Sequence, residues 1–234
     1  MKKNRPLPLF LLLTAVTLLA CSAVSSLIAT PTPIPTNTPI PSSTPMPSPT
    51  PNSVLFEDSE FTASCSLEST SEVERLVENG HFNIRVLQTN FVAWSECSRE
   101  EYSDFVLEVD ATQAGGPDNN IYGVLFRYGL DSDEFYVFVI SGDGYYALAV
   151  DGPQRSEPEL MVPWAQTSAI NLGLNTNRIK VAAVGSSISY YVNDQLLGEL
   201  QDSRFSKGVV GFFAGTLDVG DVKIAYDNLR ITQP

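Results

Sequence analysis

Histidine and cysteine are scarce in this sequence, and that scarcity limits the catalytic chemistry available to it. The 234 residues contain one histidine, His81, and three cysteines, none of them in a Cys-x-x-Cys pair. A structural zinc site needs about four nitrogen or sulfur ligands, and a nucleophile–histidine system needs a well-placed histidine. His81 follows Glu78-Asn79-Gly80, a pattern typical of a surface hairpin turn. We therefore expect neither a zinc centre nor a histidine-activated nucleophile.

Positive charge is also in short supply. Lys2, Lys3 and Arg5 precede position 53, whereas all 27 acidic residues follow it, so residues 53–234 carry a formal charge of 11 − 27 = −16. Such a domain is not expected to bind nucleic acid or to adsorb directly to anionic lipid. The charge is typical of a soluble, exposed domain, and it leaves calcium binding by carboxylates as an alternative.

The sequence has no apolar run of about 20 residues, the length that comfortably spans a membrane. It has instead a basic start followed by a short apolar run over residues 7–19. A small residue, Ala20, then precedes Cys21. This order is typical of a secretory signal peptide, which we place at residues 1–20.

The segment Leu18-Leu19-Ala20-Cys21 resembles the lipobox of bacterial lipoproteins. The resemblance implies that Cys21 takes a diacylglycerol and becomes the first residue of the mature chain. Two or three acyl chains would anchor the protein stably to the extracytoplasmic face of the cell membrane. The alternative is an ordinary signal peptide with a cysteine there by chance.

Residues 21–52 are expected to form a stalk. Nine prolines occur among the 21 residues 31–51, separated mainly by threonine and serine. This composition cannot bury a core and favours polyproline II. At about 3.1 Å per residue the segment reaches roughly 65 Å. It would hold residues 53–234, a normal length for one β-sandwich, away from the membrane.

The cysteine count agrees with this organisation. If Cys21 carries lipid, Cys65 and Cys97 remain as an even pair in an oxidising compartment, where a disulfide is expected. Two free thiols are the alternative.

Strand patterns and turn signals fill residues 53–234, and helical periodicity is rare. Phe105, Leu107 and Val109 alternate with polar residues, as expected for a half-buried strand. Short strands separated by turns predict an all-β, two-sheet antiparallel jelly-roll sandwich. The expected strands lie near 54–57, 72–78, 81–87, 91–96, 104–113, 121–129, 134–141, 144–151, 169–174, 178–184, 187–192, 195–200, 208–215 and 222–232.

Several segments, taken in order, resemble the concanavalin A-like lectin/glucanase superfamily, and most closely its 3-keto-disaccharide hydrolase-like domains. The resemblance implies a jelly roll whose concave face or rim holds sugars. The segments are Tyr102–Asp110 (Y-x-D-F-x-L-x-x-D), Asn119–Arg127 (similar to N-x-G-[IV]-x-F-R), Arg178–Val181, Ile188–Leu196, Gly208–Phe213 and Ala225–Ile231 (similar to F-D-N-[LI]-x-[IV]).

Retaining glycosidases on this fold carry E-x-D-x-E on one strand, which aims alternate acids into the cleft. Glu108-Val109-Asp110-Ala111-Thr112 begins in this way but has threonine at the last position. We expect Glu108 and Asp110 to face solvent, and we predict no catalytic residue.

Six planar side chains are the candidate sugar contacts. In the strand that contains Arg127, Val124 and Phe126 are expected to face the core, which places Arg127 on the opposite face with either a ligand or an acidic partner. The tyrosines could instead be packing residues, and Trp164 is expected in a loop. The predicted ligand-binding residues are Arg127, Tyr136, Tyr145, Tyr146, Trp164 and Tyr122.

Calcium is a possible cofactor, because the resemblance implies oxygen ligands near the chain ends. Asp58 and Asp227 could meet there, and the Asp118-Asn119-Asn120 turn is also rich in oxygen. The alternative is that these side chains cap their own turns.

Together these features predict a lipid-anchored, extracytoplasmic, non-catalytic jelly roll that binds an oligosaccharide or cell-surface glycan. A glycoside hydrolase and a structural envelope lipoprotein are the alternatives.

Overall fold

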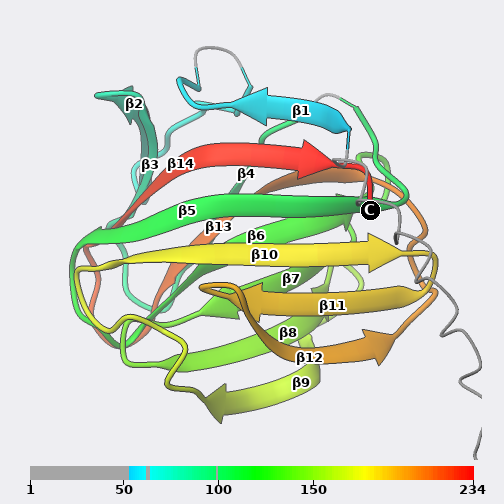
Figure 1. Ribbon diagram of the computed structural model, residues 1–234. Helices are drawn as coiled ribbons and strands as arrows, with labels where there is room; N and C mark the ends of the chain where they lie inside the picture. Colours follow the sequence, from blue (N-terminus) through cyan, green and yellow to red (C-terminus); the bar gives the residue numbers. More distant parts are fainter. Residues whose placement is uncertain (1–52, 62–63, 99) are drawn as a thin grey trace, which may run out of the picture. The chain divides into compact units, whose positions relative to one another are not determined.

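The computed structural model describes residues 53–61, 64–98 and 100–234 of the chain. All fourteen elements found there are β-strands. They form two antiparallel sheets packed face to face (Figure 1). No helix that could cross a membrane occurs among these residues. The predicted signal peptide, Cys21 and the stalk lie outside the described residues.

One sheet has eight strands. Its hairpins are joined by short turns, and β14 lies near its middle, paired with three other strands. The order is β12 (Gln195–Gln201), β11 (Ser187–Val192), β10 (Thr176–Val184), β5 (Phe105–Gly115), β14 (Val222–Thr232), β3 (His81–Val86) and β2 (Val73–Glu78), with β1 (Val54–Asp58) also paired to β14.

The other sheet has six strands and lies behind the first in Figure 1. Its order is β4 (Val92–Glu96), β13 (Val209–Thr216), β6 (Asn120–Tyr128), β7 (Phe135–Ile140), β8 (Tyr145–Asp151) and β9 (Glu159–Gln166).

The alternation predicted for β5 is confirmed. Phe105, Leu107 and Val109 are buried in the core between the sheets. Glu108 and Asp110 lie on the opposite face, paired with basic residues on β10: Lys180 Nζ is 3.4 Å from Glu108 Oε1, and Arg178 Nε is 3.0 Å from Asp110 Oδ1. These two acids are therefore surface ion-pair residues.

The six-stranded sheet is apolar on both faces. Its inner face contributes Val124, Phe126 and Phe138 to the core. Its outer face carries a second cluster, in which small and aliphatic side chains lie at the centre and Trp94 packs at one edge. The buried members of this outer cluster are Leu125, Tyr128, Phe135, Val137, Val139, Ala147, Ala149, Val209 and Phe213.

One predicted strand is wrong. Residues 169–174 form a loop, in which Asn193 Nδ2 donates to the Ala169 carbonyl at 2.8 Å and Asn177 Nδ2 donates to the Asn171 carbonyl at 3.0 Å. The strand before β10 is instead β9. It tolerates Pro163 because it lies at the sheet edge, where a missing N–H removes no ladder bond. Trp164 is therefore a strand residue, not a loop residue.

The predicted disulfide between Cys65 and Cys97 is present. It joins the segment before β2 to the end of β4 and closes a separation of 32 residues.

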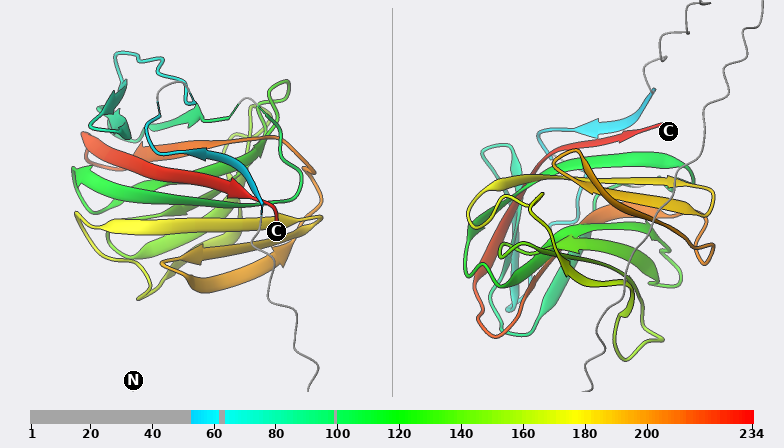
Figure 2. Two further views of the ribbon diagram at one scale, coloured as in Figure 1. Left: turned by 45° about the horizontal axis from the view of Figure 1, so that its top comes forward. Right: turned by 60° about the horizontal axis from the view of Figure 1, so that its bottom comes forward.

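The two ends of the sandwich differ in what they carry. At the end drawn on the right of Figure 1, Ser53 lies beside the C-terminus, where Gln233 N–H donates to the Ser53 carbonyl at 2.9 Å. Figure 2 shows the same pairing of β1 with the end of β14 from two other directions. The opposite end carries the turns 116–119, 141–144 and 217–221.

Candidate functional site

Two predicted sugar-contacting tyrosines belong to the core. Tyr122 and Tyr136 are both fully buried. The Tyr122 hydroxyl accepts a hydrogen bond from Asn177 Nδ2 at 3.1 Å, and the Tyr136 hydroxyl donates to Asp202 Oδ1 at 2.5 Å. Burial is the main reason that the pKa of each phenol rises to about 12. The prediction that Tyr122 and Tyr136 contact a sugar is therefore wrong. Both side chains are on the face of their strand that packs into the core, so they cannot reach a surface ligand.

Arg127 is also withdrawn from the surface. Its side chain is fully buried, and its backbone has φ of 50°, a bulge conformation that interrupts the strand alternation. The guanidinium donates to the carbonyls of Phe205, Ser103 and Gly185 at 2.8–2.9 Å. Asp104 Oδ1 is 3.9 Å away. Arg127 therefore clamps three loops together at the Ser53 end and does not face a ligand.

Tyr146 is half-buried and packs along the edge of the core. The centre of its ring lies 6.2 Å from that of Tyr190. Its side chain is on the same core-facing side of β8 as that of Leu148. Tyr146 therefore has the packing role that is the alternative prediction for the tyrosines.

Tyr145 and Trp164 are the two predicted contacts that face outward, with exposed fractions of 39% and 42%. Tyr145 precedes the inward-facing Tyr146, and Trp164 precedes Ala165, the partner of Tyr146 across β8 and β9. Both side chains therefore lie on the outer face of the six-stranded sheet. They line a hollow of about 230 Å³ at the end away from Ser53.

Polar groups complete this hollow, which we call the Tyr145–Trp164 hollow. The Ser141 hydroxyl lies 2.6 Å from Asp143 Oδ1, which fixes the Asp143 carboxylate on the turn. Asn120 Oδ1 accepts the Gly142 N–H at 3.1 Å and holds the same turn to β6. The lining residues are Asn119, Asn120, Ser141, Asp143, Tyr145, Trp164 and Leu217.

Glycine is required in this turn for a steric reason. A Cβ on Gly142 would lie 2.1 Å from the buried Gln113 Oε1, and Gly144 has φ of +97°. The turn can therefore approach the β5–β6 loop only because position 142 has no side chain. This close approach lets Asn119 of one turn and Asp143 of the other line the same hollow.

The arrangement suits binding better than hydrolysis. Aromatic faces stack on apolar faces of a ligand, and a few fixed polar groups orient it. Glycoside hydrolysis needs two carboxyl groups about 5–9.5 Å apart, but Asp143 is the one carboxylate that lines the hollow. The outer faces of β6, β7 and β8 carry buried apolar residues, among them Leu125, Val139 and Ala147. These side chains cannot supply a second carboxyl group.

The predicted calcium ligands are engaged separately. Asp58 Oδ1 accepts the N–H groups of Glu60 at 2.9 Å and Phe61 at 2.7 Å, which is the turn-capping alternative. Asp227 Oδ2 lies 3.4 Å from His81 Nε2. Within the described ranges, no three His, Cys, Asp or Glu side chains gather in a way that could hold a metal ion.

Sequence reasoning missed Asn119 and Asp143 as lining residues. The sequence marked both segments as turns, at Asp118-Asn119-Asn120 and Ser141-Gly142-Asp143-Gly144. What it could not show is that the two turns meet beside Trp164, because that depends on the pairing of β6, β7, β8 and β9.

Comparison with known proteins finds similarity in structure alone. No protein-family model matches the chain, and no curated protein sequence does either. The solved structure of carbohydrate-binding module CBM66 from Bacillus subtilis is similar at TM-score 0.58 and 17% identity, over 73% of this chain and 96% of that one.

Two further structures are similar at 12% identity. The catalytic domain of an endo-1,3-beta-glucanase (laminarinase) from Thermotoga petrophila has TM-score 0.55, over 78% of this chain and 98% of that one. A Bacillus subtilis protein of unknown function with a galectin-like fold has TM-score 0.54, over 77% and 96%. The described domain thus has the two-sheet jelly-roll sandwich fold that these solved structures share.

Proposed function

We propose that this domain is a non-catalytic glycan-binding module that holds a sugar in the Tyr145–Trp164 hollow. The observation that carries the proposal is the pair of outward aromatic side chains beside an amide and a fixed carboxylate. Stacking on the rings and hydrogen bonds to Asn119 and Asp143 are the interactions that a pyranose offers. The names of the similar structures, a carbohydrate-binding module and a laminarinase, support this at the level of fold.

The proposal includes the predicted membrane anchor. A lipid on Cys21 would place the domain on the extracytoplasmic face of the cell membrane. Because the described chain begins at Ser53, at the end opposite Tyr145 and Trp164, a tether attached there leaves the hollow at the free end.

The hydrolase alternative, including the 3-keto-disaccharide hydrolase-like type, receives less support. It would need a second carboxylate facing Asp143 across the bound sugar. The lining residues offer amide, hydroxyl and apolar groups at the other positions.

A glycan-array screen with the purified full-length protein tests the proposal, followed by calorimetry on the best neutral glycan. Trp164→Ala and Tyr145→Ala should each weaken binding by about tenfold or more, because hot-spot aromatics dominate small interfaces. Tyr191→Ala, on the outer face of the eight-stranded sheet, is the matched aromatic control and should bind normally. Absence of any glycan hit, or equal losses in all three variants, would refute the proposal.

A further inference from the structure

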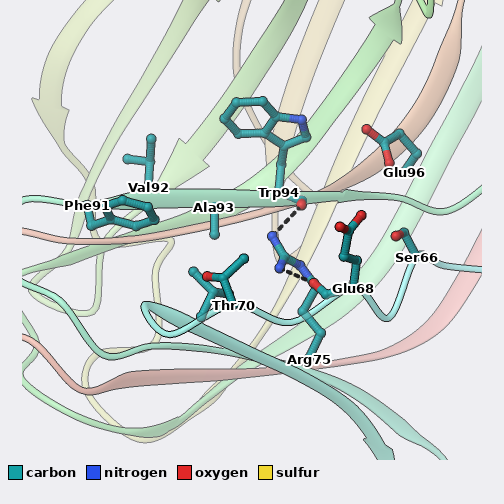
Figure 3. A pocket seen from close by; sticks show the side chains of 10 residues that line it. Ser66, Glu68, Thr70, Arg75, Phe91, Val92, Ala93, Trp94 and Glu96 are labelled. Carbon is teal, nitrogen blue, oxygen red and sulfur yellow. Dashed lines mark hydrogen bonds between the residues drawn. The ribbon is translucent and has the colours of Figure 1, made fainter.

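A second hollow, of about 320 Å³, lies at the opposite edge of the six-stranded sheet (Figure 3). It is bounded by the free edge of β4, by Arg75 of β2 and by the segment 66–70. Its size is at the lower end of the range for small-molecule sites, roughly 300–1,000 Å³. The lining residues are Ser66, Glu68, Thr70, Val73, Arg75, Phe91, Val92, Ala93, Trp94 and Glu96. We call it the β4-edge hollow.

The wall formed by residues 66–70 is held in place at several points. The Cys65–Cys97 disulfide fastens it immediately before Ser66. The Ser66 N–H donates to the Glu96 carbonyl at 3.0 Å. Arg75 adds a third attachment, because its guanidinium also bonds the Glu68 carbonyl. A preformed wall lowers the entropy cost of binding.

The hydrogen bonds of Arg75 show that its guanidinium does not pair with the two carboxylates that line the hollow. Its Nε donates to Ser95 Oγ at 2.8 Å and its Nη2 to the Trp94 carbonyl at 2.9 Å. Its partners are thus neutral oxygens, so the carboxylates of Glu68 and Glu96 are not consumed in an ion pair with it. No ion pair involving either carboxylate occurs in the described part of the chain. Two carboxylates and one guanidinium leave a net charge of −1.

The groups available to a ligand are therefore mainly acceptors beside an aromatic wall. Figure 3 shows the carboxylates of Glu68 and Glu96 and the Ser66 hydroxyl at one end of the hollow, with Phe91 and Val92 at the other. A carboxylate can only accept hydrogen bonds, and an aromatic ring offers a face on which the apolar side of a sugar can stack. Burial lowers the pKa of Arg75, and the charges of Glu96 and Glu68 oppose that shift, as expected for acids close to its guanidinium.

We infer that the β4-edge hollow binds an amino sugar, with the ammonium group between Glu68 and Glu96 and the hydroxyl groups facing Ser66 and Thr70. The inference rests on the proposed function in taking the ligand to be a glycan. It differs in site and in ligand charge, because the Tyr145–Trp164 hollow has one carboxylate and lies at the other edge of the sheet.

Calorimetry on the full-length protein tests this with the fully deacetylated glucosamine tetramer, at a pH that protonates its amines. The N-acetylated tetramer should bind about tenfold more weakly, because acetylation removes the charge. Glu68→Gln/Glu96→Gln should lower affinity for the deacetylated tetramer by about tenfold. Glu57→Gln/Glu157→Gln removes the same charge from exposed positions elsewhere and should bind normally. Added salt should weaken binding.

Three results would overturn the inference. Equal affinity for the two tetramers would remove the role of the ammonium group. Equal affinity for tri-lysine would show that the hollow recognises charge without a sugar. Loss of binding in Trp164→Ala, with normal binding in Glu68→Gln/Glu96→Gln, would assign the amino sugar to the Tyr145–Trp164 hollow. That last result would overturn the inference and support the proposed function, so failure of one proposal can be distinguished from failure of the other.

Discussion

Arg127 has the largest fully buried side chain in the described part of the chain. Its guanidinium donates hydrogen bonds to carbonyl oxygens of three different loops. Arg127→Met keeps much of the apolar stem but removes these charge-assisted bonds and leaves their acceptors unpaired. We expect the free energy of unfolding to fall by about 3–5 kcal/mol, the range for breaking buried charged networks. Urea denaturation followed by tryptophan fluorescence measures it.

Arg178→Met is the matched control for that experiment. Arg178 pairs with Asp110 at an exposed position, so its loss should cost no more than about 1 kcal/mol. Arg127→Lys should resemble Arg127→Met, because an ammonium group lacks the planar fork that reaches separate carbonyls. Equal costs for Arg127→Met and Arg178→Met would contradict the clamp.

The six candidate contacts also show what the period-2 pattern can and cannot decide. Tyr122 has the same parity as Val124 and Phe126, so its burial could have been read from the sequence. The pattern fails at Arg127, where φ of 50° breaks the alternation. It is also ambiguous for Tyr145, because both faces of β8 are apolar and nothing local marks the inner one.

At the scale of elements, thirteen of the expected strands have counterparts in the structure, whereas 169–174 does not. Those strands were predictable because alternation and short turns are local signals. β9 was not, because Pro163 argues against a strand unless the strand is known to be an edge. The meeting of the β4 edge with residues 66–70 is likewise invisible in a local pattern, since it depends on Arg75 and on the disulfide.

The disulfide gives the prediction at this scale. Cys65→Ser/Cys97→Ser should lower the free energy of unfolding by about 3–4 kcal/mol, because the bond closes a loop of roughly 33 residues in the unfolded chain. Urea denaturation with and without reductant tests it. Reductant should destabilise the wild-type protein by a similar amount and leave the double variant unchanged. A double variant as stable as the wild-type protein would show that the bond contributes nothing to the fold.

At the scale of the whole molecule, the described domain places Ser53 and the Tyr145–Trp164 hollow at opposite ends. Ser53 and the Arg127 clamp lie at one end of the sandwich, and the residues that line the Tyr145–Trp164 hollow lie among the turns at the other end. The proposed tether would therefore join the domain at the end that Arg127 clamps, away from the proposed binding end. This arrangement suits the proposed display of a binding domain, and it predicts that the tether can be altered without changing binding.

That prediction is testable through Cys21 and the proposed stalk. Cys21→Ala should move the protein from the membrane fraction to the soluble fraction, because it would remove the proposed lipid anchor. Its affinity for a soluble glycan should be unchanged, and mass spectrometry of the wild-type mature N-terminus should show acylated Cys21. Deleting residues 31–51 should keep the protein in the membrane fraction but reduce capture of glycan-coated beads, because the proposed stalk would no longer hold the domain away from the membrane. Membrane retention of Cys21→Ala would contradict the anchor, and weaker binding of soluble glycan by the deletion variant would contradict the independence of stalk and hollow.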